Sequence, residues 1–162
     1  MTTIGFRRSK TMKKRSFKSS DGLTLVELLF SAGILAFTVC GLLVSYSSAM
    51  VLAETSKNIN IATNAAATLM EQIRTDTFSS IVNDYNGLVF SVNAMPPNAG
   101  VVYVDDTNPE LLQVTISICW RQGNGVIGED KNLNGVLDAG EDTNGNGIID
   151  SPVQLVTQIA NR

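Results

Sequence analysis

Histidine is absent from this 162-residue chain, and cysteine occurs only twice, at Cys40 and Cys119. Without histidine, the chain has no Ser-His or Cys-His pair for nucleophilic catalysis and no imidazole ligand for a catalytic metal. Cys40 lies in a long apolar run and Cys119 in a predicted strand, so we expect no disulfide between them. The composition gives a hydrolase no residues to use, and we expect a protein that is not an enzyme.

Basic residues are scarce after residue 22. Seven of the twelve lysines and arginines precede that position, with one of the fifteen acidic residues, so residues 23–162 carry 5 basic and 14 acidic side chains, a net charge of −9. An acidic domain does not attract a phosphate backbone, and we expect no direct nucleic-acid binding. It suits cations instead. The basic stretch itself predicts a cytoplasmic N-terminus, because basic residues stay on that side of a membrane.

A long apolar run follows the basic stretch, from Leu23 to Val44. As an α-helix it would span about 33 Å, close to the thickness of a bilayer core and longer than the apolar part of an ordinary secretory signal. One carboxylate, Glu27, lies near its start, although an acid inside such a helix costs about 2.5–3.5 kcal/mol on insertion scales. We therefore expect a membrane helix with a functional acid. The alternative is a plain anchor whose first turn tolerates the charge.

The residues at the start of this run read Gly22-Leu23-Thr24-Leu25-Val26-Glu27. This pattern resembles the leader motif of type IV pilins and type II secretion pseudopilins. The resemblance implies cleavage by a prepilin peptidase between Gly22 and Leu23, followed by methylation of the new N-terminus. It also implies that the Glu27 carboxylate neutralises the N-terminal amine of a neighbouring subunit. Leu23 departs from the phenylalanine or methionine that is usual in the family.

The resemblance and the apolar pattern together predict four parts. Residues 1–22 form a cytoplasmic basic leader that is cleaved, and residues 23–50 form a transmembrane helix that packs in a filament core. Residues 51–162 form one extracytoplasmic globular domain, which includes the second half of the helix. Residues 128–151 are an insertion in that domain.

Apolar residues at helical spacing continue past the membrane segment and predict a single helix over about 24–77, with one face against a sheet. These residues are Leu52, Ile59, Ala62, Ala66, Leu69 and Ile73. Short β-prone runs at 88–92 and 101–104 enclose a predicted loop at 93–100.

Strict alternation over residues 112–120 predicts a half-buried strand with Cys119 on its more polar face. Residues 153–160 predict a last strand, antiparallel to it. We expect an α+β fold in which a long N-terminal α-helix packs on a small antiparallel β-sheet, a pilin-like plan with an inserted calcium-loop segment. The last two strands also resemble those of PilV- and GspI-type minor pilins, a weaker likeness than the leader.

The insertion is a tandem twelve-residue repeat, GEDKNLNGVLDA at 128–139 and GEDTNGNGIIDS at 140–151. Its first copy matches an EF-hand-type calcium loop, in which oxygen ligands come from positions 1, 3, 5, 7, 9 and 12 and a glycine at position 6 allows a sharp turn. The predicted ligands of this first loop are Asp130, Asn132, Asn134, the carbonyl of Val136, Asp138 and Glu141.

The second copy matches the same template less completely, because Val153 replaces the acid at position 12. Its predicted ligands are Asp142, Asn144, Asn146, the carbonyl of Ile148 and Asp150. Because Asp142 directly follows Glu141, no exiting helix fits between the loops, and they look more like thrombospondin type 3 or dockerin-like repeats. The alternative is an Asn/Gly-rich surface loop that binds no metal.

The resemblance implies a minor pilin subunit of a type IV pilus that initiates or modifies the filament, with Ca²⁺ as a stabilising ion. A type II secretion pseudopilin has the same expected fold, and a membrane-anchored calcium-dependent adhesin or binding module is the alternative from another class. Expected partners are a prepilin peptidase, other pilins or pseudopilins in a helical filament, and an inner-membrane assembly platform. The expected location is the bacterial inner membrane and then a periplasmic or extracellular filament.

Overall fold

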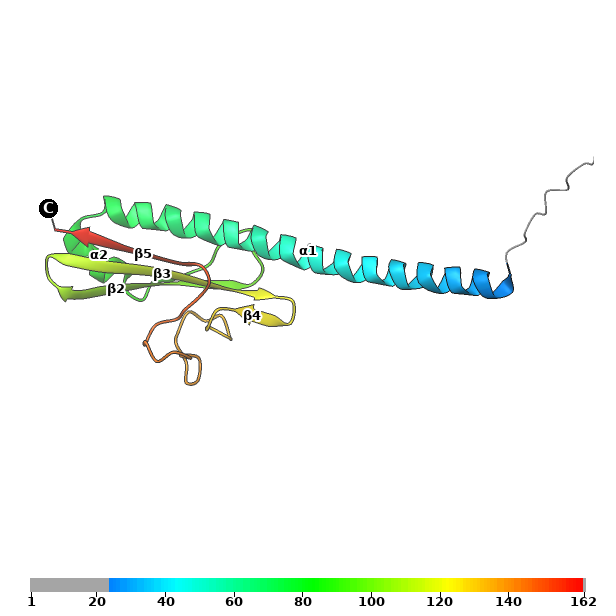
Figure 1. Ribbon diagram of the computed structural model, residues 1–162. Helices are drawn as coiled ribbons and strands as arrows, with labels where there is room; N and C mark the ends of the chain where they lie inside the picture. Colours follow the sequence, from blue (N-terminus) through cyan, green and yellow to red (C-terminus); the bar gives the residue numbers. More distant parts are fainter. Residues whose placement is uncertain (1–23, 162) are drawn as a thin grey trace, which may run out of the picture. The chain divides into compact units, whose positions relative to one another are not determined.

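The computed structural model describes residues 24–161, in which two α-helices precede a five-stranded sheet (Figure 1). The elements are α1 Leu25–Thr75, α2 Phe78–Tyr85, β1 Val89–Phe90, β2 Asn98–Asn108, β3 Leu111–Gln122, β4 Gly125–Ile127 and β5 Gln154–Ala160. The chain divides after Ser45 into two compact units. The first part of α1 belongs to one unit, and residues 46–161, here named the globular domain, belong to the other.

Helix α1 starts where its sequence provides a cap. The backbone N–H of Glu27 donates to Thr24 Oγ1 at 3.3 Å, and that of Leu28 donates to the Thr24 carbonyl at 3.1 Å. A threonine at this position satisfies an N–H that has no partner within the helix. The long helix predicted over 24–77 is confirmed, with observed ends at Leu25 and Thr75.

Strand β3 is the centre of the antiparallel sheet. One edge pairs with β2, for example Ile116 with Val102, and the other edge pairs with β5 and β4, for example Ile116 with Leu155 and Arg121 with Val126. β1 extends the sheet beyond β2. The predicted antiparallel pairing of the last strand with the alternating strand is confirmed.

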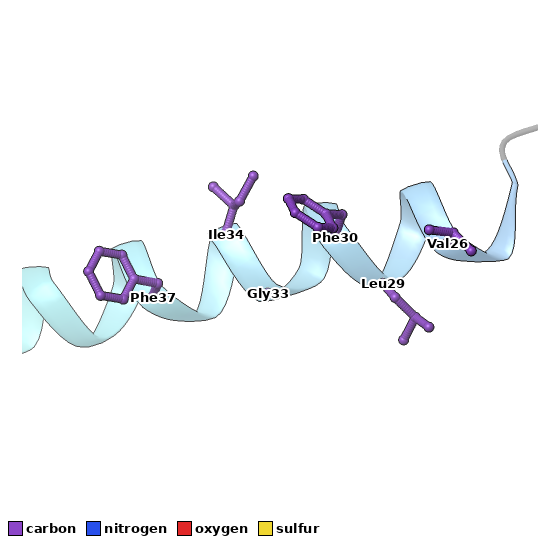
Figure 2. A pocket seen from close by; sticks show the side chains of 6 residues that line it. All are labelled: Val26, Leu29, Phe30, Gly33, Ile34 and Phe37. Carbon is purple, nitrogen blue, oxygen red and sulfur yellow. The ribbon is translucent and has the colours of Figure 1, made fainter.

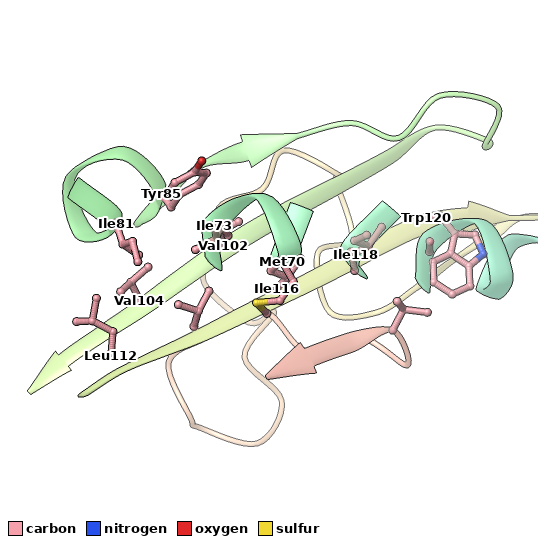
Figure 3. Close-up of a cluster of buried hydrophobic side chains, with 14 residues drawn as sticks. Met70, Ile73, Ile81, Tyr85, Val102, Val104, Leu112, Ile116, Ile118 and Trp120 are labelled. Carbon is pink, nitrogen blue, oxygen red and sulfur yellow. The ribbon is translucent and has the colours of Figure 1, made fainter. Parts of the chain in front are cut away.

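The main core lies between the second half of α1, the helix α2 and one face of the sheet (Figure 3). The face that α1 buries consists of Asn58, Ala62, Ala66, Met70 and Ile73. The predicted stripe was therefore rotated: Leu52 and Ile59 are exposed, whereas Asn58 and Met70 are buried. Leu69 is only partly buried against the core. The four-residue spacing from 58 to 70 explains the shift, because these positions form one continuous row on a helix.

The prediction that β3 is half-buried was wrong. Its residues from Val114 to Trp120 are all buried, including Cys119, which was expected on the more polar face. Cys119 forms a second cluster with Val101 and Ile149, against which Leu133 and Leu137 pack. Because side chains alternate along a strand, this cluster lies on the face opposite to the main core, and residues of the 128–151 insertion cover it.

Two short elements were not predicted. Residues 78–85 form α2, and residues 125–127 form β4. β2 also begins at Asn98, inside the predicted loop over 93–100. The Asn98 side chain bridges that loop: its Oδ1 accepts from Val92 N at 2.7 Å and its Nδ2 donates to Pro96 O at 2.9 Å.

Candidate membrane segment and cation-binding loops

The first part of α1 exposes large apolar side chains along its whole length. They are Leu25, Val26, Leu28, Leu29, Phe30, Ile34, Leu35, Phe37, Val39, Leu42, Leu43 and Val44. Among the described residues, α1 is the one helix long and apolar enough to cross a membrane by length and composition. The described part of the chain thus contains a helix that could serve as a membrane anchor.

The hydroxyl groups in this segment are satisfied within the helix itself. Ser31 and Thr38 donate to the carbonyls of Glu27 and Ile34, both at 2.8 Å, and Ser45 donates to the carbonyl of Gly41 at 2.9 Å. Each bond joins residue i to residue i−4 of the same helix. Since a hydroxyl without a partner is expensive in a bilayer, these bonds make the segment compatible with an apolar environment.

An open apolar groove runs along this segment around Gly33. It is lined by Val26, Leu29, Phe30, Gly33, Ile34 and Phe37. Figure 2 shows the labelled side chains projecting outward from the helix, with Phe30 and Phe37 on either side of Gly33 along its axis. Because Gly33 has no side chain and no atom within 4 Å of where one would begin, the helix backbone is open to close approach there.

Glu27 is exposed in the first turn of α1. Its position, three residues after the capping Thr24, also matches a capping box, in which an acid near the helix N-terminus is favourable. Gly22 and Leu23, where cleavage was predicted, lie outside the described residues. The pairing of Glu27 with the amine of another subunit stays a prediction.

The first loop of the insertion folds around the side chain of Asp130. Asp130 Oδ1 accepts from Asn134 N at 3.1 Å, and its Oδ2 accepts from Gly135 N at 2.7 Å. The amide groups of Asn132 and Asn134 both donate to Asp138 Oδ2, at 2.7 and 3.0 Å. The residues predicted at positions 1, 3, 5 and 9 therefore come together, with their backbone turning around the first aspartate.

The second loop repeats this pattern with the equivalent residues. Asp142 accepts from Asn146 N at 3.1 Å and from Gly147 N at 3.0 Å. The amides of Asn144 and Asn146 both donate to Asp150 Oδ2. In both loops the side-chain oxygen at position 5 accepts from the N–H at position 7, at 2.7 Å for Val136 and 3.0 Å for Ile148. The sequence repeat is thus a structural repeat.

The glycine at position 6 has the predicted sharp-turn conformation in both loops. Its φ is +76° at Gly135 and +78° at Gly147, a region that favours glycine. A Cβ on Gly135 would lie 2.4 Å from the Val89 side chain, whereas a Cβ on Gly147 would have no neighbour within 4 Å. The first loop is therefore seated against β1, and this part of the second loop faces open space.

The predicted metal ligands of both loops are oxygen atoms, which is the ligand type that Ca²⁺ prefers. An amide carbonyl oxygen has two lone pairs, so an Asn Oδ1 that accepts one N–H retains capacity for a cation. Within residues 24–161, however, no group of three or more His, Cys, Asp or Glu side chains is gathered as a metal site. The acids of each loop are therefore not gathered as a metal site by themselves, and the predicted ligand sets also include asparagine and main-chain oxygens. Calcium binding stays a prediction.

Two carboxylates of the first loop are buried. Asp130 is 1% exposed and Glu141 is 5% exposed. The ion pair in the part of the chain that the structure describes is Arg74–Glu71, far along the sequence from both residues. Main-chain N–H groups bond to both carboxylates, and the Lys131 ammonium donates to the Gly140 carbonyl, next to Glu141, at 2.9 Å without forming an ion pair. A buried carboxylate without an ion pair is costly, and a bound cation would lower that cost.

The insertion is anchored to the sheet at Cys119 and Tyr103. Ile149 N donates to Tyr103 Oη at 3.0 Å, and Cys119 Sγ lies 3.8 Å from the Asp150 carbonyl. Burial raises the pKa of the Cys119 thiol and the pKa of the Tyr103 hydroxyl. Both groups therefore stay neutral near pH 7, where they act as packing and hydrogen-bonding residues.

Sequence reasoning missed one residue of this site, Glu129. Its carboxylate accepts main-chain N–H groups of the second loop, from Thr143 and Asp150. The signal was present in the repeat: Gly-Glu-Asp begins both copies, so Glu129 is the counterpart of Glu141. A template applied to each loop in linear order could not find it.

Comparison with protein-family models, with curated proteins and with solved structures gave no match.

Proposed function

We propose that this chain is a minor subunit of a type IV pilus or of the related type II secretion pseudopilus, processed by a prepilin peptidase and stabilised by calcium. The observation that carries the proposal is the contrast within α1. Its first part exposes a continuous apolar surface with one acid at the start, and its second half packs on an antiparallel sheet. A subunit with this design can be stored in a membrane and later pack its helix among other helices.

Three features support the proposal. The leader pattern from Gly22 to Glu27 resembles the prepilin motif, and the hydroxyls within the apolar segment need no outside partner. The small residue Gly33 leaves the backbone open to another helix, as small residues do in membrane helix pairs. We infer that residues 25–45 lie first in the inner membrane and then in the core of a filament.

Calcium would have a structural role. The oxygen ligands of the 128–151 insertion would hold the ion, and the ion would compensate the buried carboxylates of Asp130 and Glu141. A ligand that binds only the folded state adds about 2.7 kcal/mol at a hundredfold excess over its dissociation constant. The protein should therefore melt at a higher temperature in millimolar calcium than in chelator.

Mass spectrometry of the native protein tests the processing step. We expect a mature chain that begins at Leu23 with a methylated amine, and an uncleaved chain in cells that lack the prepilin peptidase. Gly22→Leu should block cleavage, and Gly5→Leu, in the same basic stretch, is the matched control that should not. A filament-associated protein with its leader intact would contradict the proposal.

Substitution of Glu27 tests assembly. Glu27→Val should insert in the membrane at least as well as the wild type, because a charge has been removed from an apolar segment, but it should fail to enter filaments. Glu54→Val is the matched control, since Glu54 is also an exposed acid on α1. Normal incorporation of Glu27→Val at normal membrane levels would support the plain anchor, in which the first turn of the helix only tolerates the acid.

The two filament systems and the adhesin differ in what the chain accompanies. A pilus subunit should appear in sheared surface filaments, whereas a pseudopilin should be required for export of secreted proteins. A membrane-anchored adhesin would need neither the peptidase nor Glu27. Deletion of the gene, followed by pilus counts and analysis of exported proteins, separates these outcomes.

A further inference from the structure

The second loop has no acid at its own twelfth position, where Val153 is buried in the main core. A calcium loop that lacks this acid is open on one side, because the twelfth residue supplies the closing carboxylate. The first loop is closed by Glu141. We therefore compare the bonds of Glu141 in the first loop with the residue that makes the same bonds in the second loop.

Glu141 bridges the beginning and the end of the first loop. Its Oε1 accepts from the N–H of Lys131, at position 2, at 2.8 Å. Its Oε2 accepts from the N–H of Asp138, at position 9, at 3.1 Å. These two bonds fix the carboxylate beside the ligands at positions 1 and 9.

Glu129 makes the same two bonds to the second loop. Its Oε1 accepts from the N–H of Thr143, at position 2, at 3.0 Å, and its Oε2 accepts from the N–H of Asp150, at position 9, at 3.1 Å. The main chain repeats the correspondence: Glu141 N donates to Asp138 O at 3.1 Å, and Glu129 N donates to Asp150 O at 2.9 Å. Each glutamate thus donates its main-chain N–H to the carbonyl of the ninth residue of the loop that it closes.

The two loops consequently form a ring of reciprocal closure. Glu129 directly precedes the first aspartate of loop one and closes loop two, and Glu141 directly precedes the first aspartate of loop two and closes loop one. With Glu129 included, each loop has two aspartates, two asparagines and one glutamate. The two sets of ligand side chains are then equal in charge and in type, although loop one also carries Lys131 where loop two has Thr143.

We propose that Glu129 is the closing ligand of the second calcium loop. The insertion then has two complete calcium sites, rather than one complete and one partial site. This inference rests on the proposed calcium binding and adds the residue that completes it. Charge supports the inference: Asp130 and Glu141 are buried, and the second loop has three equivalent carboxylates, without an ion pair to either set among residues 24–161. A divalent cation in each loop would offset two of its three negative charges.

Isothermal titration calorimetry tests the inference, with calcium added up to millimolar concentrations to the full chain in detergent micelles. Wild type should bind two ions, Glu129→Gln and Glu141→Gln one each, and the double variant none. Glu110→Gln, which changes an exposed acid outside the insertion, is the matched control and should bind two. Emission from the buried Trp120 reports whether each variant is folded before calcium is added.

Each outcome bears on a different statement. If wild type binds no calcium, the calcium part of the proposed function fails. If wild type binds one ion, or if Glu129→Gln binds as many ions as wild type, calcium binding stands but the role of Glu129 is overturned. Should Glu129→Gln not fold, Glu129→Asp keeps the charge on a shorter side chain. It should weaken one of two binding events, and two unchanged events would overturn the inference.

Discussion

Residues 25–45 and residues 58–73 belong to the same helix, but they bury their side chains in different ways. From Leu25 to Glu54, every residue is exposed, although most residues of the first segment are apolar. The second segment buries only one row, in which Ala62 and Ala66 are small. Polar residues such as Glu71 occupy its other sides, and Glu71 pairs at 2.8 Å with Arg74, which directly follows the segment.

The difference shows which part of the helix the chain itself stabilises. The row from Asn58 to Ile73 finds its apolar surroundings within the same domain. The first segment has no such surroundings among the described residues, and each large apolar side chain that enters an apolar phase gains about 1.5–3 kcal/mol. In the proposed function, lipid or other helices would supply these surroundings.

The largest expected difference in stability is between two isoleucine-to-alanine variants, one in each segment. Ile73 is 0% exposed and Ile34 is 60% exposed. Ile73→Ala should lower the free energy of unfolding of the globular domain by about 2–5 kcal/mol, because it opens a cavity in the core. Ile34→Ala should change it by less than about 0.5 kcal/mol.

Urea unfolding of the full chain in detergent micelles, followed by Trp120 fluorescence, measures both changes. Trp120 is the single tryptophan and is fully buried in the core of the domain. Equal destabilisation by the two variants would show that the first segment contributes to the fold of the domain.

The comparison also shows how far the sequence could predict the structure. Helix α1 and strand β3 were predictable because a period near 3.6 or of 2 persists over many residues. The buried face of α1 was harder to predict than the helix itself. Leu52 and Ile59 suit an apolar face, but the row that packs contains small residues and Asn58. Contact with the sheet, rather than hydrophobicity, selects that row.

The site was predictable in its local parts only. The aspartates, asparagines and glycines of each loop came together as the spacing predicted, because they lie within a few residues of each other. The cover over Cys119 and the position of Glu129 depend on contacts between residues far apart in the sequence, such as Cys119 with Asp150. The repeat marks Glu129 as the counterpart of Glu141, but it does not show which loop Glu129 contacts, and no pattern in the sequence indicates the cover over Cys119.

A smaller effect is expected at the end of the packed segment, where Tyr85 Oη donates to Asp76 Oδ2. Tyr85→Phe should lower the free energy of unfolding by about 1 kcal/mol at pH 7. The hydrogen bond to Asp76, together with burial, raises the pKa of Tyr85. A raised pKa means that the contribution is present below the ordinary tyrosine pKa of about 10 and is lost as the pH rises through the folded-state value.

Urea titrations of wild type and Tyr85→Phe at neutral and at strongly alkaline pH measure this dependence. The difference between the two proteins should be constant up to about pH 9 and should shrink above about pH 10. A difference that stays constant throughout would mean that the hydroxyl contributes by packing alone.

Asn58 offers a gain in stability of similar or smaller size. Its side chain is buried on α1, and its Nδ2 is the buried side-chain polar atom without a hydrogen-bond partner in the described chain. Asn58→Leu should raise the free energy of unfolding by about 1 kcal/mol, because it removes the unsatisfied amide. Asn60→Leu, at an exposed position of the same helix, should add only the few tenths that come from helix propensity. Loss of stability in Asn58→Leu would show that this amide has a partner in solution, such as a buried water.

The smallest effect is expected at Thr38, within the apolar segment. Thr38 Oγ1 donates to the Ile34 carbonyl of the same helix at 2.8 Å, so the hydroxyl has its partner already and requires none from lipid or from another chain. Thr38→Ala should leave the stability of the globular domain, the membrane level of the protein and its incorporation into filaments unchanged within error. Glu27→Val, in the same segment, should abolish incorporation in the same assay. If Thr38→Ala also reduced incorporation, the hydroxyl would have to turn from its own helix to a neighbouring subunit during assembly. The first segment would then satisfy its hydroxyl groups through its own backbone only in the isolated chain, whereas the second segment would still be buried by packing within its own domain.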